Sequence, residues 1–375
     1  MLFSSEFAPI FGTIVPFLFV LSIVIFFHEL GHFLVGRLCG VQIDAFSLGF
    51  GPEVAAFVDR KGTRWRIGIL PLGGYVKFHG DANGASVSDA ATIAAMPEAE
   101  KSTTFFAQKV WKRAVIVAAG PIANFILAIV IFAGIYFVHG RGVLIPEIDK
   151  VMPASAAQAA GFVPGDIVVS IDGAKVESFE DMQRIVQTSS DTPLSFVVER
   201  HGRKLTLVAT PRRRDVTTPL GTSQVGVLGV EANATAANWH VQHYGIVDSA
   251  KLATSETWFI IEQTGSYAGR MITGRESTDQ LSGPIRIAEV SGQMAKIGLA
   301  ALLNLAAVLS ISIGILNLLP IPLLDGGHLF YYAIEAVRGR ALNERIQQVG
   351  FKIGLTLVVG LMILATYNDI LRLSK

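Results

Sequence analysis

The residues best suited to chemistry lie together in an apolar stretch near the N-terminus. His28, Glu29 and His32 form the pattern HExxH. Two histidines at positions i and i+4 share one face of a helix and can bind one zinc ion, while the glutamate acts as general base on the water that the metal holds. Ionisable side chains inside an apolar span are costly and usually functional. The pattern therefore predicts metal-assisted hydrolysis at membrane depth.

A catalytic zinc normally has three protein ligands and one open position, so a third ligand must come from elsewhere in the chain. The best candidate is Asp325, which follows Pro320 and Pro322 at the end of another apolar stretch. Proline cannot continue a regular helix, so we expect the chain to unwind there and to turn the carboxylate inward. His328, three residues further on, is the alternative third ligand.

The composition is that of a membrane protein. Of 375 residues, 51% are hydrophobic and only 16% are charged, whereas a soluble domain carries about 25% charged residues. With 31 basic and 30 acidic residues, the net charge of +1 offers no basic surface for nucleic acid. The single cysteine, Cys39, excludes an internal disulfide and a multi-cysteine metal cluster.

Four stretches are long and apolar enough to cross a membrane, and they cover residues 14–36, 114–138, 297–319 and 349–367. No basic n-region precedes the first, and no convincing small-residue cleavage site follows it, so we expect a retained span rather than a signal peptide. Basic residues gather between spans one and two and between spans three and four, which predicts that both loops are cytoplasmic. The HExxH pattern and Asp325 then lie near the cytoplasmic ends of two inward-running spans.

The loop between the first two spans predicts a β-rich segment. Residues 41–81 intersperse glycines with β-branched and aromatic residues, which favours short strands with turns. Residues 64–78 are apolar enough to lie at membrane depth, where non-helical backbone needs protein or water to satisfy its polar groups. A sheet edge there can accept a substrate strand. Residues 82–104 are predicted to form a polar linker.

A soluble α+β domain is predicted over residues 141–215. Strand patterns over 166–171, 194–199 and 204–209 surround a helical pattern over 179–187. The segment 153–166, with the strand and Asp-Gly turn that follow, resembles a PDZ domain of bacterial envelope proteases. PDZ domains capture extended peptides by strand addition, and a small domain that binds nothing is the alternative. An amphipathic helix is expected over 248–273, either on the membrane interface or against the bundle.

Several motifs together resemble the site-2 protease family, and within it the bacterial regulator of sigma E-type proteases with an embedded PDZ domain. They are the HExxH pattern, the sequence GPIANF over 120–125, the PDZ-like segment, and the Pro-x-Pro-x-x-Asp-Gly core within residues 317–327. The resemblance covers most of residues 14–330. Better-known enterobacterial members carry two tandem PDZ domains, whereas only one can be placed here.

The resemblance implies a zinc intramembrane endopeptidase that cleaves single-span proteins, typically anti-sigma factors and sometimes remnant signal peptides. By motif, His28, His32 and Asp325 match the zinc ligands, Glu29 the catalytic acid and base, and Asn317 a residue that holds the substrate. The implied location is the bacterial inner membrane, with the active site near the cytoplasmic side and the PDZ domain, which binds peptide termini or extended segments, on the periplasmic side.

A second asparagine, Asn124, is predicted to orient a substrate carbonyl or to act as interhelical glue. His240 and His243 are separated by only two residues in the predicted soluble part, where surface histidine or adventitious metal binding is expected. Two other functions are alternatives for the whole chain. An ion transporter lacks support because no inverted repeat is visible, and a silent PDZ scaffold is disfavoured because Glu29 and Asp325 are both present.

The expected fold is a multi-pass α-helical membrane protein with about four spanning helices, a membrane-associated β segment and an inserted extracytoplasmic PDZ-like α+β domain. The predicted order is a first span with HExxH, a β-rich loop and linker, a second span, the PDZ domain, an extracytoplasmic linker with the amphipathic helix, a third span with the Asp-Gly motif, and a cytoplasmic loop with a fourth span. These segments cover residues 1–38, 39–110, 111–140, 141–215, 216–295, 296–330 and 331–375.

Overall fold

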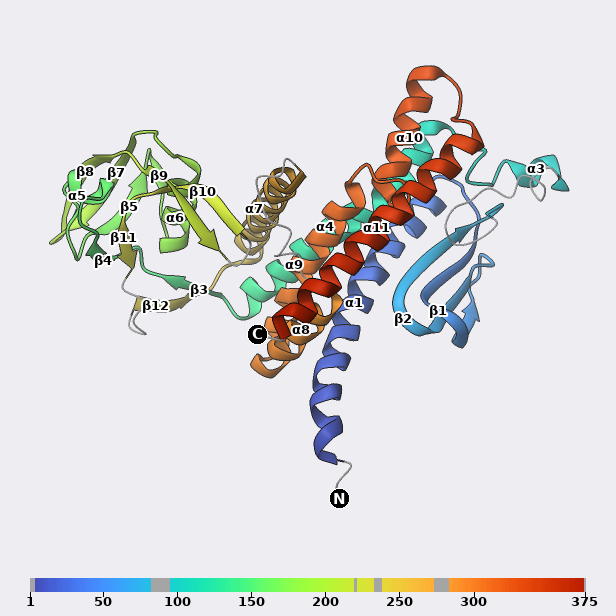
Figure 1. The fold of residues 1–375 in the computed structure, drawn as a ribbon, viewed down its shortest axis with the longest axis horizontal. Coiled ribbons are helices and arrows are strands. Elements are labelled where there is room, and N and C mark those ends of the chain that lie inside the picture. The colour runs from blue at the N-terminus through green and yellow to red at the C-terminus, as the bar shows by residue number, and fades with distance from the viewer. Residues whose placement is uncertain (1–3, 82–94, 219–220, 233–237, 273–282, 374–375) are drawn as a thin grey trace. The chain divides into compact units, whose positions relative to one another are not determined.

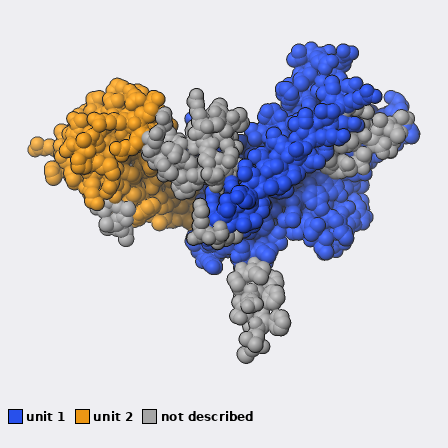
Figure 2. Space-filling view, in the orientation of Figure 1, with its two compact units in different colours: residues 1–134, 248–272, 281–375 blue, residues 135–247, 273–280 orange. Residues whose placement is uncertain are grey.

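The computed structural model describes residues 4–81, 95–218, 221–232, 238–272 and 283–373 (Figure 1). The chain divides into two compact units, which Figure 2 colours separately. Unit 1 contains residues 1–134, 248–272 and 281–375, and unit 2 contains residues 135–247 and 273–280. Most of the predicted linker over 82–104 lies outside the described residues.

Among its described residues, unit 1 has four helices that are long and apolar enough to cross a membrane, as predicted. They are α1 (Ser4–Leu38), α4 (Val110–Val138), α9 (Leu299–Leu318) and α11 (Glu344–Leu373). Small residues allow three of these helices to pack closely, which is how spanning helices associate without a hydrophobic driving force. A Cβ at Gly31 of α1 would overlap the Ala119 carbonyl oxygen of α4, and a Cβ at Gly314 of α9 would lie 2.8 Å from the Phe125 ring of α4.

The β-rich segment forms two long strands, β1 (Ile43–Val58) and β2 (Arg64–Phe78), beside α1 (Figure 1). Each strand bends back on itself: residues 45–48 pair both with 74–77 and with 64–67, and residues 64–68 also pair with 53–58. Gly49 and Gly51 make the bend in β1 with φ of 89° and 84°, which favours glycine. The sheet therefore has residues 74–78 at one edge.

A network at the β1–β2 turn ties this sheet to α1. The guanidinium group of Arg37 donates to Asp59 and Thr63, and the Trp65 indole donates to Asp59 over 3.0 Å. Burial by itself would raise the pKa of Asp59, but these hydrogen bonds and two from backbone amides outweigh it and lower the pKa to about 2. The carboxylate therefore stays charged, and the sheet stays anchored, at any physiological pH.

Beyond α9, the chain unwinds as the prolines predict and then forms α10 (Asp325–Arg338). A partly buried ion pair between Arg113 of α4 and Glu335, 2.6 Å apart, holds the far end of α10. Helix α11 packs closely over the unwound segment and α10. Two glycines make this possible, because a larger residue at either position would collide with the atoms beneath it. A Cβ at Gly354 would overlap the Pro322 carbonyl oxygen, and a Cβ at Gly350 would overlap the Tyr331 hydroxyl.

Three further helices of unit 1 lie in the described part of the chain: α3 (Glu98–Lys101), α7 (Ile246–Ile272) and α8 (Pro284–Ile297). Helix α7 lies where an amphipathic helix was predicted, and residue 273 of that prediction is outside the described residues. Helix α8 was not anticipated. The Asp369 carboxylate of α11 accepts the backbone N–H groups of Gly283 and Arg286, each over 3.0 Å, at the start of α8.

Unit 2 is an α+β body with a four-stranded sheet in the order β6-β5-β7-β8. Three two-stranded pairs, β4 with β11, β3 with β12, and β9 with β10, surround it. The elements are β3 (Arg141–Leu144), β4 (Ile148–Val151), α5 (Ala156–Ala159), β5 (Ile167–Ile171), β6 (Ala174–Lys175), α6 (Phe179–Thr188), β7 (Leu194–Arg200), β8 (Arg203–Ala209), β9 (Arg212–Thr218), β10 (Gly221–Val227), β11 (Val230–Ala232) and β12 (Trp239–Gln242).

The described strands of unit 2 continue beyond residue 215, where the predicted soluble domain ends. Strand β11 pairs with β4, and β12 pairs with β3, so residues up to 242 belong to the same body as residues 141–151. The pairing partners are separated by about 80 residues or more in sequence, which is why a local pattern did not reveal them.

Adding one methyl group at Gly354 is predicted to displace α11. The new Cβ would overlap a backbone oxygen that cannot rotate away, so we expect Gly354→Ala to lower the free energy of unfolding by about 1–3 kcal/mol. Gly360→Ala is the matched control on the same helix, because nothing lies within 4 Å of its Cβ position. Thermal unfolding of both variants in detergent measures the difference, and equal melting temperatures would contradict the close contact.

Candidate metal centre

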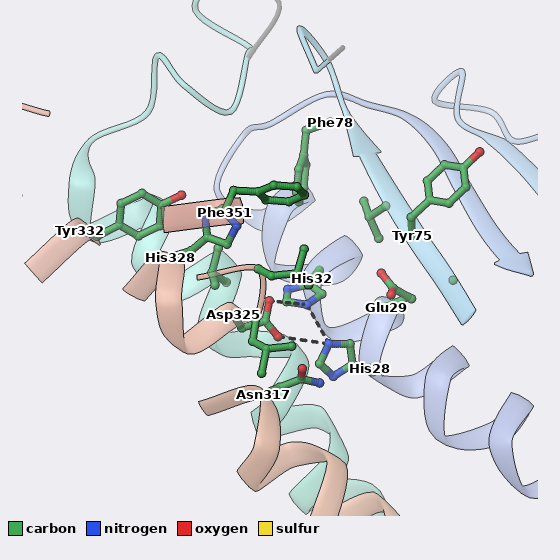
Figure 3. Close-up of a pocket in the computed structure, with 15 residues that line it drawn as sticks. His28, Glu29, His32, Tyr75, Phe78, Asn317, Asp325, His328, Tyr332 and Phe351 are labelled. Carbon is green, nitrogen blue, oxygen red and sulfur yellow. Dashed lines mark hydrogen bonds and ion pairs between the residues drawn. The ribbon is translucent and has the colours of Figure 1, made fainter. Parts of the chain in front are cut away.

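Three potential metal ligands converge where α1 meets the start of α10 (Figure 3). His28 and His32 lie one turn apart on α1, and Asp325 is the first residue of α10. The two Nε2 atoms are 3.2 Å apart, and the Asp325 carboxylate lies 3.2 Å from His28 Nε2 and 3.5 Å from His32 Nε2. All three donor atoms fall within 4.8 Å of one another. The predicted combination of two histidines and one carboxylate is therefore brought together.

The turn before α10 aims the carboxylate at the histidines. Leu323 has a φ of 116°, which side-chain-bearing residues rarely adopt and which reverses the chain within a few residues of the prolines. Gly326 and Gly327 allow the first turn of α10 to fold directly against the unwound segment, because a Cβ at either would overlap backbone atoms of residues 318–322. The prolines end α9, and these glycines then fix the direction in which α10 starts.

The donor set suits a zinc ion. His32 Nδ1 lies 2.9 Å from the Ile116 carbonyl oxygen, which can only accept, so Nδ1 carries the proton and the neutral ring has its lone pair on Nε2. The Asp325 Oδ2 atom is buried and makes no hydrogen bond of regular geometry with a described residue. The lone pairs of His32 Nε2 and of the Asp325 carboxylate therefore face each other in a buried site. A bound cation would remove their mutual repulsion. Two imidazoles and one carboxylate are a typical set for catalytic zinc.

A cavity of about 220 Å³ opens beside this group. Glu29 and Asn317 line it, as do the edge residues Gly74, Tyr75 and Val76 of β2. Figure 3 shows the Glu29 carboxyl group between the histidines and the β2 strand. A titratable side chain and an amide therefore share the cavity with the three candidate ligands.

Glu29 is held against the sheet edge. Gly74 packs directly on it: a Cβ there would lie 3.0 Å from Glu29 Cγ and 2.9 Å from Ser47 O. Val76, two residues further along the same edge, lines the cavity together with Glu29. The edge of β2 therefore borders the Glu29 side chain directly.

Other residues singled out from the sequence lie differently. His328 lines the same cavity but is outside the metal-binding group found among the described residues, and Figure 3 shows it near Tyr332 and Phe351. Burial lowers the pKa of His328, which favours the neutral form of its ring. Asn124 is fully buried on α4, does not line the cavity, and places its amide nitrogen 3.2 Å from His28 Nδ1. His240 belongs to β12 in unit 2.

Sequence reasoning missed the contribution of α4 to this site. A Cβ at Gly120 would overlap His32 Nε2 and would lie 2.9 Å from His28 Cε1. Only glycine leaves room for both imidazole rings against the helix. The spacing could have shown this, since Ile116, Gly120 and Asn124 recur every four residues and therefore share one helical face.

Replacing Gly120 is predicted to empty the site without unfolding the protein. In Gly120→Ala the added methyl group would push the His32 ring away, so we expect the bound metal per protein to fall at least tenfold. Gly134→Ala is the control, because it adds the same methyl group on α4 with nothing within 4 Å. Metal content after dialysis, measured by elemental analysis, tests this, and full metal occupancy in Gly120→Ala would refute it.

Comparisons with known proteins agree with the chemistry of this site. The model of peptidase family M50 matches residues 16–361. A protein of Agrobacterium fabrum named as a zinc metalloprotease is 49% identical over 360 residues, which cover 96% of each chain. One of Rhizobium meliloti with the same kind of name is 47% identical over 359 residues, again 96% of each chain, and the metalloprotease MmpA of Caulobacter vibrioides is 40% identical over 382 residues, covering 96% of this chain and 95% of that one. The chain therefore belongs to peptidase family M50, the site-2 protease family, and is a zinc metalloprotease.

Proposed function

We propose that His28, His32 and Asp325 bind the catalytic zinc and that Glu29 is the general base and acid in peptide-bond hydrolysis. The observation that carries this proposal is the convergence of the three donor atoms within 4.8 Å, beside the Glu29 carboxyl group in one cavity. Family membership supports zinc-dependent proteolysis, and no other group of three potential ligands is found among the described residues.

The metal site would activate water and substrate, and Glu29 would transfer the proton. A bound zinc lowers the pKa of its water and polarises the scissile carbonyl group. Glu29 accepts one proton from the attacking water while the oxygen of that water bonds to the carbonyl carbon. Glu29 then gives this proton to the amide nitrogen as the carbon–nitrogen bond breaks, which leaves a carboxyl group and an amine. The Gly74 backbone, which packs against the Glu29 side chain, keeps the carboxyl group beside the cavity for both transfers.

The substrates are proposed to be single-span membrane proteins of the anti-sigma factor type, together with remnant signal peptides. Enzymes of this family act on membrane proteins within the bilayer, and the HExxH residues lie in α1, one of the four long apolar helices. A substrate helix hides its carbonyl groups in hydrogen bonds, so it must unwind before water can attack. Substrate helices with weak helix-forming residues near the cleavage point are therefore favoured.

The edge of β2 is proposed to hold the unwound substrate as an added strand. Backbone groups of alternate residues point away from a neighbouring strand. The Phe78 amide donates to the Asp81 side chain over 3.2 Å, so we assign Val76 and Gly74, at intervals of two residues, to the same outward-facing set. A substrate strand paired with Gly74 would pass directly beside Glu29.

Asn317 is proposed to bind a carbonyl group of the substrate. It lies in the last turn of α9, lines the cavity, and comes from the same chain segment that supplies Asp325. An amide side chain in this place offers a donor to a carbonyl oxygen without adding charge.

Unit 2 is proposed to be the PDZ-like domain, on the periplasmic side of the inner membrane, where it binds peptide termini or extended segments of substrates. Its α+β architecture, with short strands around one four-stranded sheet, supports this assignment. The concentration of basic residues in the loops 37–113 and 338–345 supports a cytoplasmic position for the metal centre.

Removing the carboxylate of Glu29 is predicted to abolish cleavage without removing the metal. We expect Glu29→Gln to cut purified single-span peptides in detergent at least about 100-fold more slowly, because the general base is lost. Metal content stays at the wild-type value, and a zinc chelator stops the wild-type enzyme. Glu98→Gln, at a side chain that is 92% exposed on α3, is the control and leaves the rate unchanged. A Glu29→Gln enzyme with more than a tenth of the wild-type rate would overturn the assignment.

Strand pairing predicts a local effect of substrate backbone changes. Replacing one amide near the cleavage point by an ester removes a donor to the β2 edge, at a cost of about 1 kcal/mol, or about fivefold in kcat/KM. The same replacement ten residues away is expected to have no effect. A series of peptides with one ester each measures this, and a uniform response along the series would exclude strand addition.

A further inference from the structure

Each histidine of the metal centre has its second ring nitrogen directed at α4. His32 Nδ1 contacts the Ile116 carbonyl oxygen at 2.9 Å, and His28 Nδ1 contacts the Asn124 side-chain amide at 3.2 Å. Ile116 and Asn124 flank Gly120 at intervals of four residues, and Gly120 leaves the space that both rings occupy. One face of α4 therefore supports both imidazole rings from behind.

The protonation requirements of a metal-binding imidazole determine which atom donates in the contact between His28 Nδ1 and the Asn124 side chain. His28 Nε2 faces the site, 3.2 Å from both His32 Nε2 and the Asp325 carboxylate. A neutral imidazole with its Nε2 lone pair free for a metal carries its proton on Nδ1 and needs an acceptor there. In the amide orientation with Nδ2 toward His28, two donors would face each other.

In the present amide orientation, the side-chain oxygen of Asn124 lacks a hydrogen-bond donor among the described residues. Because Asn124 is 0% exposed, bulk water does not reach the oxygen either. The hydrogen-bond network decides which end of an amide is oxygen. Turning the amide by 180° brings the oxygen to His28 Nδ1, which pairs the orphaned acceptor and also provides the acceptor that the ring requires.

We propose that Asn124 is a positioning residue of the metal centre. Its side-chain oxygen accepts the Nδ1–H of His28 and so fixes the tautomer and the ring orientation in which Nε2 binds zinc. This inference rests on the proposed ligand set. It gives Asn124 a role behind the metal rather than a contact with substrate, in agreement with its absence from the cavity lining. The Ser310 hydroxyl group of α9 donates to the backbone carbonyl oxygen of Asn124 over 2.8 Å and so holds the backbone of α4 in place.

Three variants separate this role from interhelical packing. Asn124→Leu removes both amide groups, Asn124→Asp keeps an acceptor oxygen and removes the amide donor, and Ser310→Ala removes the neighbouring contact between α4 and α9 while leaving His28 alone. Zinc affinity of the full chain in detergent is measured by competition with a chelator. The absorption spectrum of the cobalt-substituted protein reports ligand geometry, and unfolding of the metal-free protein reports stability.

We expect Asn124→Leu to bind zinc about 10- to 100-fold more weakly, as is typical when the partner of a metal-bound histidine is lost. Asn124→Asp is expected to stay within about threefold of wild type with an unchanged cobalt spectrum, and Ser310→Ala to bind zinc like wild type. Wild-type affinity in Asn124→Leu would overturn the proposal. So would an Asn124→Asp protein as weak as Asn124→Leu, because the amide donor would then be the group that matters.

His28→Ala distinguishes failure of this inference from failure of the ligand assignment. A large loss of zinc affinity in His28→Ala together with an unchanged Asn124→Leu overturns only the role of Asn124. Wild-type affinity in His28→Ala overturns the ligand set and the inference with it. A loss of affinity in Ser310→Ala equal to that in Asn124→Leu assigns the effect to helix packing and also rejects the proposal.

Discussion

The close approach of α1 and α4 is the constraint on which the metal centre depends. Two imidazole rings must fit between these helices, and the helices must still touch. Gly31 lets α1 rest on the Ala119 carbonyl oxygen, and Gly120 leaves the volume that the rings of His28 and His32 fill. In a lipid environment small residues at such contacts are the main way to bring backbones together. The same contact places the Ile116 carbonyl oxygen against the His32 ring and the Asn124 side-chain amide against the His28 ring.

The second requirement is an interruption of regular helix at membrane depth. A carboxylate on a continuous helix would not be free to turn toward α1, and Pro320 and Pro322 end α9 before Asp325. An unwound segment exposes backbone polar groups, which the bilayer cannot satisfy. Here α10 begins at once and α11 lies directly on the segment through Gly354. The break is therefore covered by protein on the side where α11 packs.

The β segment must meet two opposing requirements, an open strand edge and a fixed position beside α1. It must leave one strand edge available, and an open edge is a liability in any sheet. The anchoring of the turn by Arg37 and Asp59 and the stacking of Phe46 on Trp65, with ring centroids 4.3 Å apart, hold the sheet in one position beside α1. Gly74 at this edge then lies against Glu29, where a paired strand and the candidate general base would meet.

The sequence by itself determined the features that depend on neighbours in the chain. The four long apolar helices follow from length and composition, the shared face of His28 and His32 follows from helical periodicity, and the break after α9 follows from the prolines. Only the tertiary structure places the Asp325 carboxylate, rather than the His328 ring, beside both histidines, because both residues lie in the first turn of one helix whose direction depends on the turn at Leu323. It also decided the pairing of β11 and β12 and the partner of Asn124, since His28 is 96 residues away and no local pattern encodes such contacts.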